Sequence, residues 1–522
     1  MRPIFLAIVL LLGSAAQAVE PLTPQEWRAD IAALESGVAG MHPAPFHSVS
    51  EADFSAAADR LAARADEASE AEMIAGLTEL VAMLGEGHSR LVVPLGGFGP
   101  VGAGHREDEA PRIAPLAYIP AQPMLAGEEY VVIRADADHA GLIGARIVSI
   151  DGVPIAEAAS RIAPLVNADS PAERVTRIGD FLMVPALLRA RGFETGRRWE
   201  LAKPSGETVT VELPEMREPV EWQGSEPYPD PPADAQSPVN WVVPLGDGRV
   251  LLRLGEIGDQ EDIAMTGLAQ ATAALLGREE DPALIVDLRG NPGGDNSQID
   301  ALVRTVIRDE RLFEPGRLFV LIDGRTHSAA VNLANQLDRW TPAIFVGSPT
   351  AASPNSYGDA RPLELPNSGL SARISTLYWQ DSGPMDERAS ISPEIAAPFT
   401  QAAIAAGRDP ALDMIAAIIA APPGAPGRFT GNAAMFGHDV GVTIELSGDS
   451  PTLAIPGLIP EPVALEALRI GEDGAVQATI SVAGATIPLR ALILGDRLLG
   501  HVSVRGRIYA LALHRDGPPT AH

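Results

Sequence analysis

A serine on a predicted sharp turn is the first residue of this sequence whose position suits chemistry. Ser328 lies in the stretch "VLIDGRTHSAAVNLANQL", after an apolar segment from Leu318 to Ile322 and before Val331, Ala334 and Leu337, which have helical spacing. This order predicts a strand, a sharp turn and a helix. Such an elbow exposes a hydroxyl and directs backbone N–H groups toward whatever the hydroxyl attacks, so Ser328 is a candidate nucleophile.

A second turn, "VDLRGNPGGDNSQ", precedes the elbow. A strand is predicted to end at Asp287, and Gly293 and Gly294 then lead into a helix. Glycines allow the backbone to approach a ligand closely, and N–H groups at a helix start suit an anion. Alone, this pattern is explained as a simple connection between strand and helix. Because Ser328 follows Gly293 by only 35 positions, the two turns together predict a nucleophile beside an oxyanion hole.

A histidine occupies a third predicted connection. Ile74, Leu77, Val81 and Leu84 have helical spacing and are followed by "GEGHSRLVVPL". Gly85 is predicted to end this helix in the left-handed conformation, which places His88 on a tight loop before a strand. Functional residues are common on loops between rigid elements.

Composition limits the classes of partner. The chain has 522 residues, no cysteine and a formal net charge of −29, with 46 % hydrophobic and 20 % charged residues. These values predict a globular chain of about three or four domains. The negative charge argues against nucleic-acid and anionic-lipid partners, and the lack of cysteine excludes disulfides.

The first 18 residues are predicted to be a secretory signal peptide. "MRPIFLAIVLLLGSAAQAVE" has Arg2, an apolar run from Ile4 to Leu12, and Ala16 and Ala18 in an A-x-A pattern. A membrane anchor needs roughly 20 apolar residues, so the run is too short for one. The expected mature protein is exported, periplasmic or secreted, and has no membrane anchor.

The rest of the chain is predicted to contain four regions. Residues 19–105 have helical patterns that end in the His88 loop and begin with a capping box at Thr23–Glu26, and residues 106–225 are mixed. After the Pro-rich "SEPYPDPPADAQSP", residues 236–426 alternate strands and helices, which predicts an α/β core. Residues 427–522 alternate with period two, which predicts a small all-β domain.

Several motifs together resemble one enzyme family. "ALIVDLRGNPGG", "LIDGRTHSAA", "IFVGSPTAASPNSYGD", "ELPNSGL" and "ISPEIAAPFT…GRDPAL" are similar to the catalytic domain of the tail-specific (C-terminal processing) and tricorn-core serine peptidases. The region around "LIGARIVSIDGVPI" resembles the PDZ-like module that often accompanies this domain. The resemblance implies a crotonase-like α/β fold and attack of Ser328 on a peptide carbonyl. It also implies an oxyanion hole of backbone N–H groups at Gly293 or Gly294 and at Ala329.

The family has two branches that differ in the general base, and this sequence resembles the histidine branch. In the Ser–Lys branch a lysine follows the motif G-x-x-T-x-G-K-G, but here Ser353 occupies its place. The chain contains one lysine, Lys203, in a predicted hairpin of the mixed region, where a solvated lysine is expected. "LGEGHSRL" resembles the segment that supplies the histidine in the tricorn-like branch, which implies His88 as the general base.

The resemblance also implies an acid that orients the histidine. The family carries this acid just before the motif that is "PEI" here, and Glu387 is preferred, with Asp386 as the substitute. The tricorn-like pattern has a serine directly before the histidine, where this chain has Gly87.

The remaining histidines are weaker candidates. His327 is expected to support the elbow, and His42 and His47 are expected to be structural or to line the groove. The histidines after residue 427 lie in no cluster with metal-ligand spacing, so neither a metal nor another cofactor is predicted.

The leading hypothesis is an exported serine peptidase that acts on peptides or proteins bound along a strand edge. The same machinery would cleave an ester, so an esterase is an alternative. A non-catalytic peptide- or ligand-binding protein on this scaffold is another. Enzymes of related fold that use coenzyme A are disfavoured by export and by the serine elbow. The sequence leaves the oligomeric state open.

Overall fold

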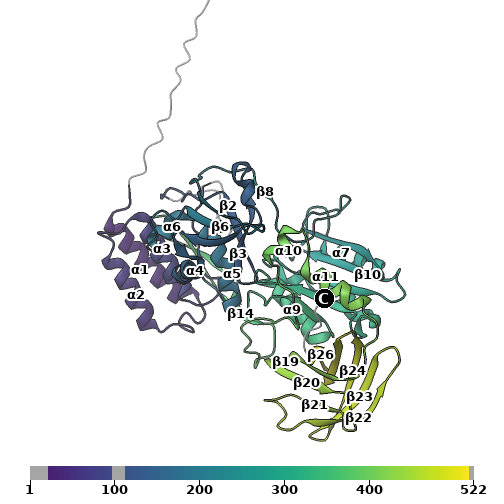
Figure 1. The fold of residues 1–522 in the computed structure, drawn as a ribbon. Helices are drawn as coiled ribbons and strands as arrows, with labels where there is room; N and C mark the ends of the chain where they lie inside the picture. Colours follow the sequence, from purple (N-terminus) through teal and green to yellow (C-terminus); the bar gives the residue numbers. More distant parts are fainter. Residues whose placement is uncertain (1–20, 97–111, 517–522) are drawn as a thin grey trace, which may run out of the picture.

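The computed structural model describes residues 21–96 and 112–516 (Figure 1). The predicted signal peptide lies outside these residues. None of the helices in the described ranges is long and apolar enough to cross a membrane.

Three helices form the N-terminal region at the left of Figure 1. They are α1 (Pro24–Met41), α2 (Glu51–Ala63) and α3 (Glu70–Ala82). The predicted capping box is confirmed, because the Thr23 side chain accepts from the Glu26 N–H and Glu26 accepts from the Thr23 N–H. Gly85 has a φ of 70°, as predicted, and turns the chain from α3 toward the short strand β1 (Arg90–Leu91).

The middle region consists of a sheet with helices packed on it. The sheet has the order β2-β3-β4-β6-β7, with β5 paired to β4 and β8 paired to β3. The predicted hairpin around Lys203 is confirmed as β6 and β7. The strands are β2 (Ala121–Ala126), β3 (Glu129–Ala135), β4 (Arg146–Ile150), β5 (Val153–Pro154), β6 (Arg198–Ala202), β7 (Thr208–Glu212) and β8 (Gln223–Gly224). The helices are α4 (Ile155–Ile162), α5 (Pro171–Leu182) and α6 (Pro185–Ala190), with the short 3₁₀ helices η1 (Ala137–Leu142) and η2 (Ala163–Leu165).

The predicted α/β core is confirmed as a six-stranded sheet of order β18-β13-β12-β11-β10-β9. All neighbours are parallel except the edge pair of β9 and β10. The strands are β9 (Asn240–Gly246), β10 (Arg249–Leu254), β11 (Ala283–Asp287), β12 (Leu318–Ile322), β13 (Ile344–Gly347) and β18 (Ile395–Ala396). The helices are α7 (Met265–Leu276), α8 (Asp300–Arg308), α9 (Ala329–Trp340), α10 (Gln401–Ala405) and α11 (Pro410–Ala420), with η3 (Asn296–Gln298) and η4 (Glu310–Phe313).

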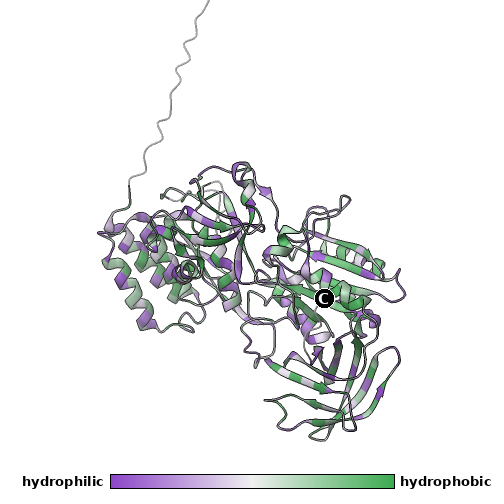
Figure 2. Ribbon diagram, viewed as in Figure 1, coloured by the Kyte–Doolittle hydropathy of each residue, from purple (hydrophilic) through white to green (hydrophobic). Residues whose placement is uncertain are grey.

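Both faces of this sheet are covered, which explains why its strands are continuous apolar runs. Helices α7, α8 and α9 pack on one face. Helix α11 and residues Leu499 and Ala512 of the C-terminal domain pack on the other. Figure 2 shows the strands beside α7 in green, the colour of hydrophobic residues.

Two small sheets connect the α/β core to the N-terminal region. One has the order β1-β16-β15, with β15 (Arg361–Glu364) and β16 (Ser371–Ile374). The other pairs β14 (Asn355–Gly358) with β17 (Leu377–Gln380). Because β1 pairs with β16, the segment that carries His88 is hydrogen-bonded to a loop region of the core.

The predicted all-β C-terminal domain is confirmed and is a closed eight-stranded barrel. Alternate residues point inward and fill its interior with an apolar cluster. The strands are β19 (Arg428–Met435), β20 (His438–Glu445), β21 (Thr452–Ala454), β22 (Val463–Ile470), β23 (Ala475–Val482), β24 (Ala485–Leu494), β25 (Arg497–Val504) and β26 (Arg507–Arg515).

A carboxyl group beside the central sheet predicts a pH-dependent stability. Glu394 precedes β18, and its Oε2 accepts from the Phe345 N–H of β13 at 2.7 Å. Burial raises the pKa of Glu394 from 4.5 to about 8. The folded protein therefore keeps this proton where the unfolded chain has lost it, so the contribution of Glu394 to stability falls as the pH rises from about 4.5 to about 8.

We expect Glu394→Gln to remove the loss of stability at high pH, because glutamine does not ionise. The glutamine side chain still offers an oxygen that can accept from the Phe345 N–H. Thermal unfolding followed by circular dichroism should give similar melting temperatures for both proteins at pH 5 and a higher one for the variant at pH 8. A difference that stays constant across this pH range would contradict the assignment.

Candidate active site

Ser328 lies on the predicted elbow, between β12 and α9. Its backbone has φ 53° and ψ −127°, a conformation that is rare for residues with a side chain. Such conformations cost about 1–3 kcal/mol and persist only where the surroundings hold them. Ser328 is the N-cap residue of α9, yet its side chain makes no capping hydrogen bond. The hydroxyl is therefore available for other contacts.

The surrounding turns hold this strained residue in place. The Asn291 carbonyl accepts from the His327 N–H at 2.9 Å, and its side-chain Oδ1 accepts from the Gly293 N–H at 2.8 Å. The Asp323 carboxylate accepts from the Gly290 N–H at 3.0 Å. The glycine turn and the serine elbow are therefore joined to each other by hydrogen bonds, as their proximity in sequence predicted.

Glycine is required where the two turns meet. A Cβ on Gly293 would lie 2.5 Å from the Ser328 Cβ, and Gly293 and Gly294 have φ values of 107° and 137°. The Gly293 N–H is already used by Asn291. Within the described chain, the N–H groups of Gly294 and Ala329 have no acceptor, and both residues line the cleft beside Ser328. Gly294 and Ala329 are thus the better candidates for an oxyanion hole.

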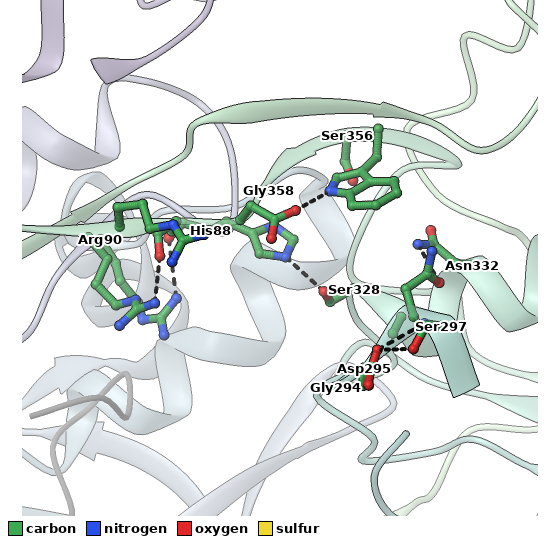
Figure 3. A pocket seen from close by; sticks show the side chains of 16 residues that line it. His88, Arg90, Gly294, Asp295, Ser297, Ser328, Asn332, Ser356 and Gly358 are labelled. Carbon is green, nitrogen blue, oxygen red and sulfur yellow. Dashed lines mark hydrogen bonds between the residues drawn. The ribbon is translucent and has the colours of Figure 1, made fainter. Parts of the chain in front are cut away.

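His88 reaches the serine because its loop is fixed from both sides. The buried carboxylate of Glu86 accepts from the N–H groups of His88 at 2.7 Å and Ser89 at 2.9 Å. It also accepts from the Ser375 hydroxyl at 2.8 Å, just after β16. His88 Nε2 lies 3.0 Å from Ser328 Oγ, although the two residues are 240 positions apart. This distance is within hydrogen-bond reach, as the sequence predicted. Figure 3 shows the two side chains pointing toward each other.

The surroundings of His88 favour its neutral form. Burial, and then the charge of neighbouring His327, hold the pKa of His88 well below its ordinary value. Burial alone would also lower the pKa of His327, but Glu173 and Asp169 raise it. The adjacent imidazoles therefore differ in proton affinity, and His88 is the one that is free to accept a proton from Ser328.

The structure does not bring the two predicted acids to His88. Asp386 accepts from the Ser382 hydroxyl at 2.6 Å and from Arg388 at 2.9 and 2.8 Å, and Glu387 is exposed. Neither acid contacts His88 in the part of the chain that the structure describes. The expected contact from Asp386 or Glu387 to His88 is therefore not formed here.

A local motif explains why Asp386 is occupied. In each of three D-x-R segments, the aspartate accepts from the backbone N–H and the guanidinium of the arginine two positions later. These pairs are Asp287 with Arg289, Asp309 with Arg311, and Asp386 with Arg388. The spacing alone does not assign this pair, because in the D-x-R segment of Asp323 and Arg325 the guanidinium contacts Asp180 instead.

Other residues surround His88 instead. The ring of His327 packs against that of His88 with centroids 4.3 Å apart, so its role extends beyond the expected support of the elbow. His327 Nε2 lies 3.4 Å from Asp169 Oδ2, and Asp169 comes from the segment before α5. Sequence reasoning missed Asp169. The only local signal is the S-x-x-E pattern at Ser170 and Glu173, which starts α5 and fixes the position of Asp169.

Two other predicted assignments are resolved by contacts. Lys203 pairs with Glu207 at 3.1 Å in its hairpin, as expected for a solvated lysine. His42 stacks on His47 and Tyr357, and its Nε2 lies 3.7 Å from Glu86 Oε1, so it packs behind the His88 loop.

The hydroxyl of Ser328 faces an open cleft of about 700 Å³. Its wall is polar and carries charges of both signs (Figure 3). The charged side chains that line it are Arg90, Arg361, Arg373, Asp295 and Asp359. The cleft is large enough for several residues of an extended chain.

Among the comparisons with known proteins, only solved structures match the chain. No family model and no curated protein sequence matches the chain. Among solved structures, mature CPAF has a TM-score of 0.52 at 14 % identity, covering 76 % of this chain and 96 % of CPAF. Mature CPAF complexed with lactacystin has a TM-score of 0.51 at 14 % identity, covering 75 % and 97 %. A photosystem II D1 C-terminal processing protease matches with a TM-score of 0.32 at 15 % identity, covering 72 % of this chain and 93 % of that protein. The chain thus shares its fold with CPAF.

The strained backbone of Ser328 generates a prediction about stability. We expect Ser328→Gly to unfold about 1–4 °C above Ser328→Ala, because glycine adopts the φ of 53° without steric cost and this relief exceeds its greater loss of conformational freedom. Calorimetry of the two variants would measure the difference. Equal melting temperatures, or a lower one for the glycine variant, would mean that relief of strain does not exceed glycine's loss of conformational freedom.

Proposed function

We propose that this protein is an exported serine peptidase in which Ser328 is the nucleophile and His88 is the general base. The observation that carries the proposal is the 3.0 Å contact between Ser328 Oγ and His88 Nε2, on an elbow whose backbone is held in a strained conformation. A structural serine needs neither feature.

The first half of the reaction forms an acyl-enzyme. Ser328 Oγ attacks the carbonyl carbon of the scissile peptide while His88 Nε2 takes its proton. The N–H groups of Gly294 and Ala329 donate hydrogen bonds to the carbonyl oxygen and stabilise the negative charge that develops on it. The C–N bond then breaks as the proton passes from His88 Nε2 to the leaving amine.

The second half restores the serine. Water enters the cleft and loses a proton to His88 Nε2 as its oxygen bonds to the acyl carbon. The second tetrahedral intermediate collapses, the bond to Ser328 Oγ breaks, and the serine regains its proton from His88. Each half of the reaction begins with a neutral His88, which its buried environment favours.

A peptide substrate is supported by the strand edge beside the cleft. Ser356 and Gly358 of β14 line the cleft, and within the described residues β14 pairs only with β17. The other edge of β14 can add a substrate strand through main-chain hydrogen bonds. The resemblance of the motifs to tail-specific and tricorn-core peptidases supports the same substrate class. Export rests on the sequence of residues 1–18 alone.

A fluorophosphonate probe tests the nucleophile directly. We expect the mature wild-type protein to gain one adduct by intact mass and Ser328→Ala to gain none. His88→Ala should label at least about 100-fold more slowly, because general-base catalysis typically contributes factors of 10²–10⁴. Lys203→Ala should label like the wild type and serves as the control for a Ser–Lys mechanism.

The outcomes separate the alternatives. A folded wild-type protein that stays unlabelled after treatment with a chelator would exclude the catalytic hypothesis and leave the binding protein as the alternative. Labelling at Ser328 with cleavage of esters but not of an unstructured protein such as casein would identify an esterase. Cleavage of that protein, lost in Ser328→Ala, would support the peptidase.

A second substitution tests the acid. Since Glu387 is exposed and does not contact His88, we expect Glu387→Gln to label within about threefold of the wild-type rate. Removing a distant, exposed charge changes the free energy of the site by well under about 1.4 kcal/mol, the value that corresponds to a tenfold change. A loss of 100-fold or more, with an unchanged melting temperature, would instead restore Glu387 as the acid that orients His88.

A further inference from the structure

Three buried polar atoms meet behind the catalytic histidine without hydrogen-bond partners. They are His88 Nδ1, Asp169 Oδ2 and His327 Nε2, and each is unsatisfied among the described residues. The three side chains come from separate segments of the chain, and their ligand atoms all lie within 4.8 Å of one another. Buried polar groups normally have partners, so a cluster of three such atoms is suited to a ligand that contacts all of them.

The distance between two of these atoms is compatible with two ligands of one metal ion. His327 Nε2 and Asp169 Oδ2 are 3.4 Å apart, beyond the usual range for an N–H···O bond. Two ligands at about 2.0–2.1 Å from a tetrahedral zinc ion are separated by roughly 3.3–3.4 Å. Two imidazoles and one carboxylate are also a donor set that zinc accepts, with the fourth position open.

The backbone leaves room for this ion. A Cβ on Gly87 would lie 2.7 Å from Glu173 Oε2, 2.7 Å from His327 Nε2 and 2.8 Å from Asp169 Oδ2, so a side chain at this position would collide with the cluster. A second cleft of about 400 Å³, lined by Gly87, His88 and His327, gives access from solvent.

Neighbouring groups fix the ligands and offset charge. Glu173 accepts from the Asp169 N–H at 2.7 Å, and its Oε1 lies 3.6 Å from His327 Nε2. Asn167 donates to the Gly87 carbonyl at 2.6 Å. Such outer contacts orient metal ligands in known sites.

We propose that His88, Asp169 and His327 form a zinc site that switches the serine off. A neutral imidazole carries one proton on its two nitrogens. When Nδ1 of His88 binds zinc, that proton resides on Nε2, which then donates to Ser328 Oγ and no longer accepts from it. The inhibitory part of this inference rests on the proposed function, whereas zinc binding itself does not.

Zinc binding is measured first on the full mature chain carrying Ser328→Ala, so that the result is independent of catalysis. After removal of metal with a chelator, titration with Zn²⁺ against a chromogenic chelator should reveal one site. Asp169→Asn and His327→Gln, each added to this background, should weaken binding at least tenfold. Gly87→Ala should also weaken zinc binding, because its methyl group would lie against the ligand atoms. Circular dichroism shows whether each variant is folded.

A matched control is present in the chain. His139 and Asp136 form a second histidine–aspartate pair, with Nδ1 and Oδ1 2.6 Å apart, and among the described residues no third ligand lies with them. His139→Gln should leave zinc binding unchanged. Absence of a zinc site in the Ser328→Ala protein, or binding that survives His327→Gln and Asp169→Asn alike, would overturn the proposal.

The switch is then tested on the wild-type protein with the fluorophosphonate probe. Zinc at tenfold above its measured dissociation constant should slow labelling at least about fivefold, since roughly 90 % of sites are then occupied. A chelator should reverse the effect, and Mg²⁺ should not reproduce it. If zinc binds and labelling stays unchanged, the inhibitory switch is refuted. If the wild-type protein never labels, the proposed function is refuted, and the binding measurement alone then shows whether the zinc site exists.

Discussion

The buried carboxylate of Glu86 is the interaction on which the arrangement of the candidate site depends. It accepts from two backbone N–H groups of the His88 loop and from the Ser375 hydroxyl, so it joins the N-terminal region to the strand β16. Burial opposes its charge, yet contacts with His42 and Ser89 outweigh this and hold the pKa of Glu86 below its ordinary value. A buried charge with every partner in place fixes geometry strongly, because any displacement leaves it unsatisfied. This clamp brings His88 to a serine 240 positions away in the sequence.

The serine has its own support, which is independent of the clamp. Asn291 receives hydrogen bonds from both the elbow and the glycine turn, and Asp323 ties the elbow back to Gly290. These contacts lie at the carboxyl ends of β11 and β12, where parallel strands of an α/β sheet commonly place their sites. The strained backbone of Ser328 is therefore a property of the rigid core, and the position of His88 is a property of the contact between regions. A change at that contact would displace the base without altering the nucleophile.

The sequence predicted those parts of the site that are local. The elbow, the glycine turn and the His88 loop each have a pattern of apolar spacing and glycines that fixes their conformation, and a family resemblance connected them. Asp169 could not be found in this way, because it meets His88 and His327 only after three separate segments pack together. The acid was assigned to Glu387 or Asp386 by position in a motif, whereas in the structure Asp386 is held by Arg388. The sequence therefore predicted the local conformation of each turn, but it did not predict contacts between segments that are distant in the chain.

The missing acid and the unsatisfied cluster are one feature. A histidine that accepts a proton at Nε2 must carry its own proton at Nδ1, and in serine hydrolases a carboxylate usually holds that proton there. Here no described protein group accepts from Nδ1, so the occupant of the space beside Gly87 decides the tautomer. A water molecule in that space, accepting from Nδ1 and donating to Asp169, would set the tautomer that His88 needs as a base. A zinc ion would set the opposite tautomer with the same protein atoms. The reactivity of Ser328 is therefore controlled from the far side of the imidazole, by a site that the nucleophile does not touch.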